Sequence, residues 1–129
     1  MNIEELNIGN WIAWNNEPCK VVGINPPYLD VVDCKNKPAY GVHIEEVAPI
    51  EITTWKLKRN GFTKRNNSQI YYRIIDSLGL SLYIYKCSSH CSVELFVRET
   101  LKHASITINY IHQLQNACKL VGKELEVEL

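Results

Sequence analysis

The residue types that suggest chemistry most directly lie in the segment Cys87-Ser88-Ser89-His90-Cys91. Thiols and imidazoles are the ligands that Zn²⁺ prefers in proteins. A structural zinc site needs four ligands, and the other candidates lack the short paired spacing of a zinc finger or ribbon. Those candidates are His103, His112 and Cys118. The pattern therefore favours a polar loop between two strands over a metal site.

A cysteine nucleophile would be the alternative chemistry, with Cys91 or Cys118 paired to His112. No residue marks the orienting third group or the oxyanion site that such catalysis needs. The sequence also lacks a glycine-rich phosphate loop, a serine nucleophile elbow and a His-Glu-x-x-His motif. Asp30 and Asp33 flank two valines and fit outward-facing strand positions better than a catalytic pair. We therefore expect a non-enzymatic protein with no catalytic residue, metal or cofactor.

A cluster of cations and tyrosines is the main candidate for ligand binding. It comprises Lys56, Lys58, Arg59, Lys64, Arg65, Tyr71, Tyr72 and Arg73. Cations beside aromatic rings can hold a base by stacking and a phosphate by charge, although tyrosines on a strand more often serve sheet packing. The candidate ligand-binding residues from this part of the chain are Arg59, Arg65, Tyr71, Tyr72, Arg73 and Arg98.

The elements that position these residues fall into two parts. From Asn7 to Ile50, short apolar runs alternate with turn clusters such as Asn15-Asn16-Glu17-Pro18. Regularly spaced short strands of this kind predict a small, strongly bent sheet. We assign residues 1–51 to a small β-barrel-like unit.

Residues 52–129 are predicted to form an α+β unit that packs with the first part as one compact domain. Thr53 to Gly61 has a capping residue at its start and a glycine at its end, which is typical of a short helix. Alternating apolar residues then predict an antiparallel meander and, at the end of the sequence, a closing strand. The predicted strands are 70–75, 80–85, 93–97 and 124–129.

An amphipathic helix is predicted before the closing strand. Its apolar positions recur at steps of three and four, at Ile111, Leu114, Ala117, Cys118 and Val121. Asn109 is the predicted cap and Gly122 the predicted stop. The opposite face carries His112, Gln113, Gln115, Asn116 and Lys119. We take His112, Gln115 and Asn116 as candidate ligand-binding residues, with tying the helix to adjacent loops as the alternative role.

The charges are balanced in total and uneven along the chain. The 129 residues carry 14 Lys and Arg against 14 Asp and Glu. Residues 1–51 have a net charge of −5, residues 52–123 of +8 and the last six of −3. The neutral total makes bulk nucleic-acid binding unexpected. The uneven distribution fits either solvated surfaces that pair with each other or an anion-binding face on the basic part.

Several sequence features point to a cytoplasmic protein with no membrane partner. The sequence shows no signal peptide and no run of the roughly 20 apolar residues that a membrane span needs. Its five cysteines are scattered and odd in number, which fits buried or free thiols in a reducing compartment.

Three stretches carry a family resemblance: Leu6 to Trp11, Ile50 to Phe62, and Tyr110 to Asn116 followed by Gly122 to Leu125. With these stretches the chain resembles small uncharacterised proteins common in phages and prophages of gut Bacteroidales. The His-Gln-Leu-Gln-Asn run of the third stretch is the most specific part. The resemblance covers most of the chain and implies a phage accessory protein in the cytoplasm of the host bacterium, with no established catalytic residues.

Accessory phage proteins of this size often bind rather than catalyse, as inhibitors or as sponges that remove a host immune signal. The resemblance and the basic second part together predict a counter-defence sponge for an anionic, nucleotide-type signalling molecule such as a cyclic nucleotide. Such pockets commonly form at the interface of a homo-oligomer. Two alternatives stay open: a protein-binding inhibitor or adaptor of a host enzyme, and a small nucleic-acid-binding module.

Overall fold

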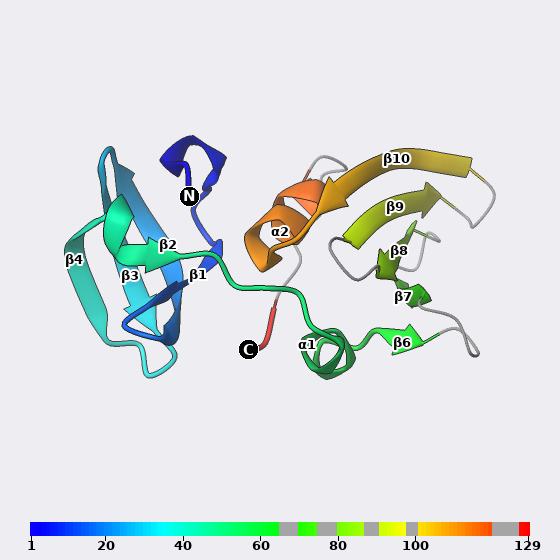
Figure 1. Cartoon of the computed structure of the whole chain (residues 1–129), viewed down its shortest axis with the longest axis horizontal. Coiled ribbons are helices and arrows are strands. Elements are labelled where there is room, and N and C mark those ends of the chain that lie inside the picture. The colour runs from blue at the N-terminus through cyan, green and yellow to red at the C-terminus, as the bar shows by residue number, and fades with distance from the viewer. Residues whose placement is uncertain (65–69, 75–79, 87–90, 98–100, 120–126) are drawn as a thin grey trace. The chain divides into compact units, whose positions relative to one another are not determined.

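The computed structural model describes residues 1–64, 70–74, 80–86, 91–97, 101–119 and 127–129. The chain divides into two compact units. Unit 1 comprises Met1–Glu51 and Tyr110–Val127, and unit 2 comprises Ile52–Asn109 and Glu128–Leu129. In the described residues, each unit has a five-stranded antiparallel sheet and one α-helix (Figure 1). The fold is therefore of the mixed α+β class that the sequence predicts.

Unit 1 is built on a sheet with the strand order β4-β3-β2-β1-β5. Its strands are β1 (Trp11–Trp14), β2 (Glu17–Asn25), β3 (Tyr28–Asp33), β4 (Pro38–His43) and β5 (Val47–Ala48). Two 3-10 helices, η1 (Ile3–Glu5) and η2 (Ile44–Glu46), accompany them. Among the described residues no pairing joins β4 to β5, so the barrel-like closure stays a prediction.

The turn between β1 and β2 is shorter than the sequence pattern indicates. Asn15 and Asn16 both have positive φ, at 52° and 61°, a backbone conformation that asparagine tolerates well. Two such residues make the tight hairpin turn whose twist matches that of the strands. Glu17 consequently starts β2 directly opposite Trp14 instead of belonging to the turn. The buried core of unit 1 includes Ile12 of β1, Cys19 of β2 and Val31 of β3.

The helix of unit 1 is α2 (Ile111–Lys119). The apolar positions that the periodicity predicts are buried, namely Ile111, Leu114, Ala117 and Cys118. The helix starts after Tyr110, whose backbone N–H donates to Gln113 Oε1 at 3.2 Å, and not after the predicted cap Asn109. The sequence pattern places this helix in a second unit of residues 52–129, whereas in the structure it lies in the same compact unit as Met1–Glu51.

The end of the chain is described only in part. The predicted stop of α2 at Gly122 and the start of the predicted closing strand lie outside the described residues. Residues 127–129 have no regular secondary structure.

Unit 2 contains α1 (Thr54–Arg59) and a sheet with the order β10-β9-β8-β7-β6. Its strands are β6 (Thr63–Lys64), β7 (Ile70–Ile74), β8 (Leu80–Lys86), β9 (Cys91–Val97) and β10 (Leu101–Ile108). The strands β7, β8 and β9 correspond to the predicted meander. The sequence pattern does not predict β10, whose pairing with β9 shifts register between Lys102 and Ala104. This irregularity interrupts the alternation by which strands are identified.

Both ends of α1 follow the sequence signals. The Thr53 hydroxyl accepts the backbone N–H of Lys56 at 3.3 Å, as expected of an N-cap. Beyond the last turn, Gly61 has φ of +82°, in the left-handed region where a side chain is strained.

We expect Gly61→Ala to lower the free energy of unfolding by about 1 kcal/mol, because alanine is strained at this φ. Gly61→Asn should cost less, because asparagine tolerates the left-handed region better than alanine. Urea denaturation followed by circular dichroism measures both variants. Equal costs for the two variants would contradict the backbone explanation.

Candidate functional site

Strand β7 holds α1 at both of its ends. Tyr71 and Arg73 are two residues apart, so their side chains leave the same face of the strand. The Tyr71 hydroxyl lies 3.5 Å from Thr54 Oγ1 in the first turn of α1. Arg73 Nη1 donates to the backbone carbonyl of Asn60 at 3.1 Å, just after the last turn. These contacts fix the short helix against the sheet of unit 2.

The side of α1 that turns away from the sheet is exposed and basic. Leu57 is buried, whereas Trp55, Lys58 and Arg59 are exposed and lie at the i, i+3 and i+4 spacing of one helix face. We call these three residues the α1 face. Trp55 is 61% exposed as a residue, which is unusual for one of this size.

Arg59 is placed by two contacts on this face. Its guanidinium lies 5.2 Å from the centre of the Trp55 ring, within cation–π distance. Its Nη2 lies 3.9 Å from Glu128 Oε1 across a solvent-exposed gap, where an ion pair adds little stability. Asn60 holds the backbone of Glu128 in place by donating from Nδ2 to its carbonyl at 2.8 Å. The α1 face therefore carries a stacked cation and aromatic ring with one carboxylate beside them.

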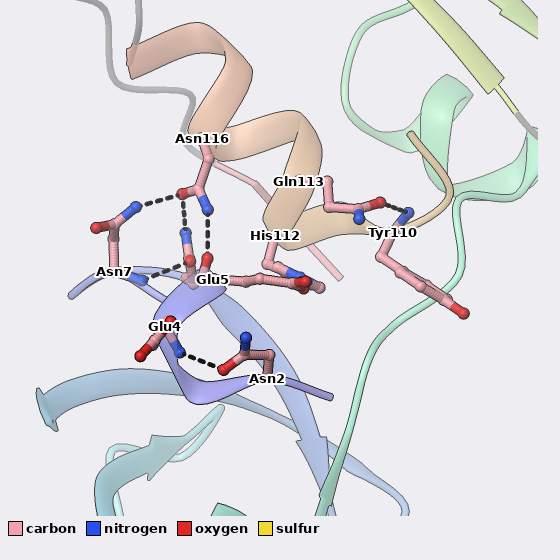
Figure 2. Close-up of polar contacts among 9 residues, drawn as sticks. Asn2, Glu4, Glu5, Asn7, Tyr110, His112, Gln113 and Asn116 are labelled. Atoms are coloured by element: carbon pink, nitrogen blue, oxygen red, sulfur yellow. Dashed lines mark hydrogen bonds and ion pairs between the residues drawn. The ribbon is translucent and has the colours of Figure 1, made fainter. Parts of the chain in front are cut away.

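The polar side of α2 contacts the first residues of unit 1. Asn116 Oδ1 accepts hydrogen bonds from the side-chain amides of Asn7 and Asn10, each at 2.9 Å. Asn116 Nδ2 donates to the backbone carbonyl of Glu5 at 2.8 Å (Figure 2). Both groups of the Asn116 amide are thus used in holding α2 to the chain before β1.

Gln115 makes a second set of contacts, to the end of this segment and to the first residue of β1. Its Oε1 accepts the backbone N–H of Trp11 at 2.9 Å, and its Nε2 donates to the carbonyl of Gly9 at 3.0 Å. The side chain is buried. Lys119, one turn further along the helix, donates to the carbonyl of Ile8 at 3.1 Å from an exposed position. Gln115 and Asn116 therefore have the tying role that sequence analysis raised as the alternative, and ligand binding by them stays a prediction.

His112 is the third member of this side of α2 and is fully buried. Its ring lies nearly parallel to that of Tyr110, with centres 5.9 Å apart. Nε2 is 3.7 Å from Glu5 Oε2, beyond hydrogen-bond distance, and neither ring nitrogen has a hydrogen-bond partner among the described residues (Figure 2). Burial lowers the pKa of His112, while the Glu5 carboxylate opposes this effect. The imidazole is therefore neutral near pH 7.

The remaining predicted residues divide between buried, half-buried and undescribed positions. Tyr71 is buried, and Tyr72 and Arg73 are half-buried. Arg65, Arg98, Cys87 and His90 lie outside the described residues. Among the candidate ligand-binding residues of the basic part, Arg59 is the one that the structure describes on an exposed surface. A pocket formed by converging arginines therefore stays a prediction.

The described part of the chain brings together no group of three or more metal-ligating side chains. Within the described residues, Cys19, Cys34 and Cys118 form no disulfide. No described helix is both long and apolar enough to cross a membrane.

Comparison with known proteins identifies no relative of this chain. No family model, curated protein or solved structure matches the chain. The resemblance to phage proteins stays a prediction.

Trp55 is absent from the predicted cluster of cations and tyrosines, and Lys58 belongs to that cluster but not to the narrower set of candidate ligand-binding residues. The sequence feature that could have identified Trp55 and Lys58 is their spacing to Arg59, which places all three residues on one face of the predicted helix. The direction of that face depends on Tyr71 and Arg73, which approach α1 from a strand more than ten residues away in the sequence. Periodicity within the helix alone does not contain this information.

Proposed function

We propose that this protein is a non-enzymatic binding protein that holds an anionic, nucleotide-type ligand on the α1 face. The observation that carries the proposal is the exposed Trp55 indole with the Arg59 guanidinium 5.2 Å from its ring centre. An exposed aromatic ring offers a stacking surface for a base, and neighbouring cations attract phosphate.

The surroundings of the α1 face support an anionic ligand. Lys58 lies on the same face, and Lys64 on β6 is exposed in the same unit. The Glu128 carboxylate competes for Arg59 only weakly, because the pair is exposed and 3.9 Å apart.

The role that we propose for this binding is sequestration of a signalling nucleotide, as the phage resemblance predicts. Sequestration needs cations, a stacking surface and no catalytic group. The second predicted class, an inhibitor or adaptor of a host protein, would present a surface to a macromolecule, and its test is separate from that of nucleotide binding.

A panel of cyclic mono-, di- and trinucleotides and linear nucleotides, titrated by calorimetry into the whole protein, tests the proposal. We expect at least one of them to bind. Trp55→Ala should then weaken binding by about tenfold, because loss of base stacking costs about 1–3 kcal/mol. Arg59→Gln should weaken it as well, and Glu128→Gln should strengthen it by removing the competing carboxylate.

Matched controls come from unit 1. Tyr40→Ala removes the aromatic ring of a residue that is 76% exposed, and Lys35→Gln removes an exposed cation. Neither should change nucleotide affinity. The proposal fails if no nucleotide of the panel binds, or if Tyr40→Ala weakens binding as much as Trp55→Ala does.

A further inference from the structure

Unit 1 contains a cavity of about 270 Å³ at the end of its sheet. The cavity lies where the β1–β2 turn and the loop between β3 and β4 come together. Its lining includes Trp14, Glu17, Cys19, Val31, Asp33 and Lys37. This volume is below the range of about 300–1,000 Å³ typical of pockets for whole small molecules, and it suits a single side chain.

The strand register explains the composition of this cavity. Cys19 lies opposite Asp33 and is buried together with Val31, so the inner part of the cavity is apolar. Trp14 is half-buried against the core and lies opposite Glu17. The cavity thus combines an apolar inner part, an aromatic ring and two carboxylates.

Both carboxylates lie close to the inner part of the cavity. The pKa of the Cys19 thiol is raised, first by burial and then by the negative charges of Asp33 and Glu17. Asp33 Oδ1 accepts the backbone N–H groups of Lys35 and Lys37, each at 2.9 Å, which fixes the orientation of the carboxylate. Among the described residues, no hydrogen bond uses the other oxygen, Oδ2.

The charge of the surrounding unit favours a cation. Residues 1–51 hold three lysines against eight acidic residues. Lys37 also lines the cavity, and its positive charge reduces the local attraction for a cation. Its side chain is long and exposed, so the amine can extend into the solvent away from the cavity.

We infer that this cavity receives a single arginine or lysine side chain of a protein partner. The alkyl part of that side chain contacts Cys19 and Val31, and its charged group lies between Glu17 and Asp33 beside the Trp14 ring. Carboxylates and an aromatic ring are the groups that recognise a guanidinium or ammonium ion. This site is separate from the proposed nucleotide site, since it uses different residues, opposite charge and the other unit.

Two peptides test the inference with the full-length protein. The probe is acetyl-Gly-Arg-Gly-amide, and the control is the same peptide with norleucine in place of arginine. We expect the arginine peptide alone to shift the amide signals of Cys19 and Val31 and the indole signal of Trp14 in nuclear magnetic resonance spectra. Equal shifts with the norleucine peptide would overturn the inference.

Variants separate a specific site from general attraction to an acidic unit. Glu17→Gln should weaken binding of the arginine peptide by about tenfold, because it removes one charged partner. Asp33→Asn keeps the Oδ1 acceptor and should weaken binding similarly without unfolding the loop. Lys37→Ala should strengthen binding.

The matched control is Glu45→Gln, which removes an exposed negative charge away from the cavity. If Glu45→Gln weakens binding as much as Glu17→Gln, the cavity is not the site. Nucleotide binding, measured in the same samples, should be unchanged in all four variants.

Discussion

Gln115→Ala is expected to lower the free energy of unfolding by about 3 kcal/mol, as measured by urea denaturation. The variant leaves two backbone groups, the N–H of Trp11 and the carbonyl of Gly9, without their side-chain partner. Part-buried polar groups that lose their hydrogen bonds each cost about 1–3 kcal/mol. The effect is large for a glutamine because the side chain is itself buried.

Lys119→Gln is the matched control for this prediction. Lys119 also donates to a backbone carbonyl before β1, but it does so from the exposed end of α2. Water can replace this hydrogen bond, so we expect a change of less than about 0.5 kcal/mol. A cost for Gln115→Ala as small as that of the control would show that the amide is dispensable for the fold. The predicted ligand-binding role of Gln115 would then regain support.

The second large effect is a loss of stability in mild acid that depends on His112. Burial lowers the folded-state pKa of His112 below its ordinary value of 6.5. As the pH falls below about 6.5, the unfolded chain takes up the proton first, so the free energy of unfolding decreases. For one proton the decrease is at most about 1.4 kcal/mol per pH unit, and it ends once the folded form is also protonated.

Urea unfolding curves recorded at a series of pH values from about 7.5 to about 5, the range in which histidine titrates, measure this effect. His112→Leu removes the titrating group and should flatten the dependence. Glu5→Gln should make the loss steeper, because the Glu5 carboxylate raises the pKa of His112 and the positive N-terminal amino group lowers it. An unchanged slope in His112→Leu would contradict the assignment to this residue.

Local signals in the sequence predicted local structure well. The Thr53 cap and Gly61 delimit α1, and the asparagines at positions 15 and 16 turn the first hairpin. The apolar periodicity of α2 predicted the residues that are buried on one side. Each of these features depends on neighbours within about four residues, where residue type and spacing dominate.

The polar side of α2 shows where such reasoning ends. His112 and Gln115 look solvent-facing by periodicity, yet they are buried because the chain before β1 covers them. The hydrogen-bond partners of Gln115 are more than 100 positions away in the sequence. One signal was present: this side of the helix has amides and a histidine where a solvated face would carry mostly charged residues.

The two proposed sites also depend on contacts between residues that are distant in the sequence. Trp55 is exposed because Tyr71 and Arg73 hold the other side of α1. The cavity of unit 1 exists because two hairpin ends meet around Cys19 and Val31. In the sequence, Asp33 suggested only an outward-facing strand residue, whereas in the structure it lines this cavity.

The indole N–H signals of Trp11, Trp14 and Trp55, the three tryptophans of the chain, test the proposed nucleotide site most directly. Trp55 reports on the α1 face, Trp14 on the cavity of unit 1, and Trp11 on the segment held by Gln115. On titration with the nucleotide that binds best in calorimetry, we expect the Trp55 signal to shift and the other two to stay in place. A nucleotide that leaves Trp55 unshifted, or that shifts Trp14 instead, would contradict binding at the α1 face.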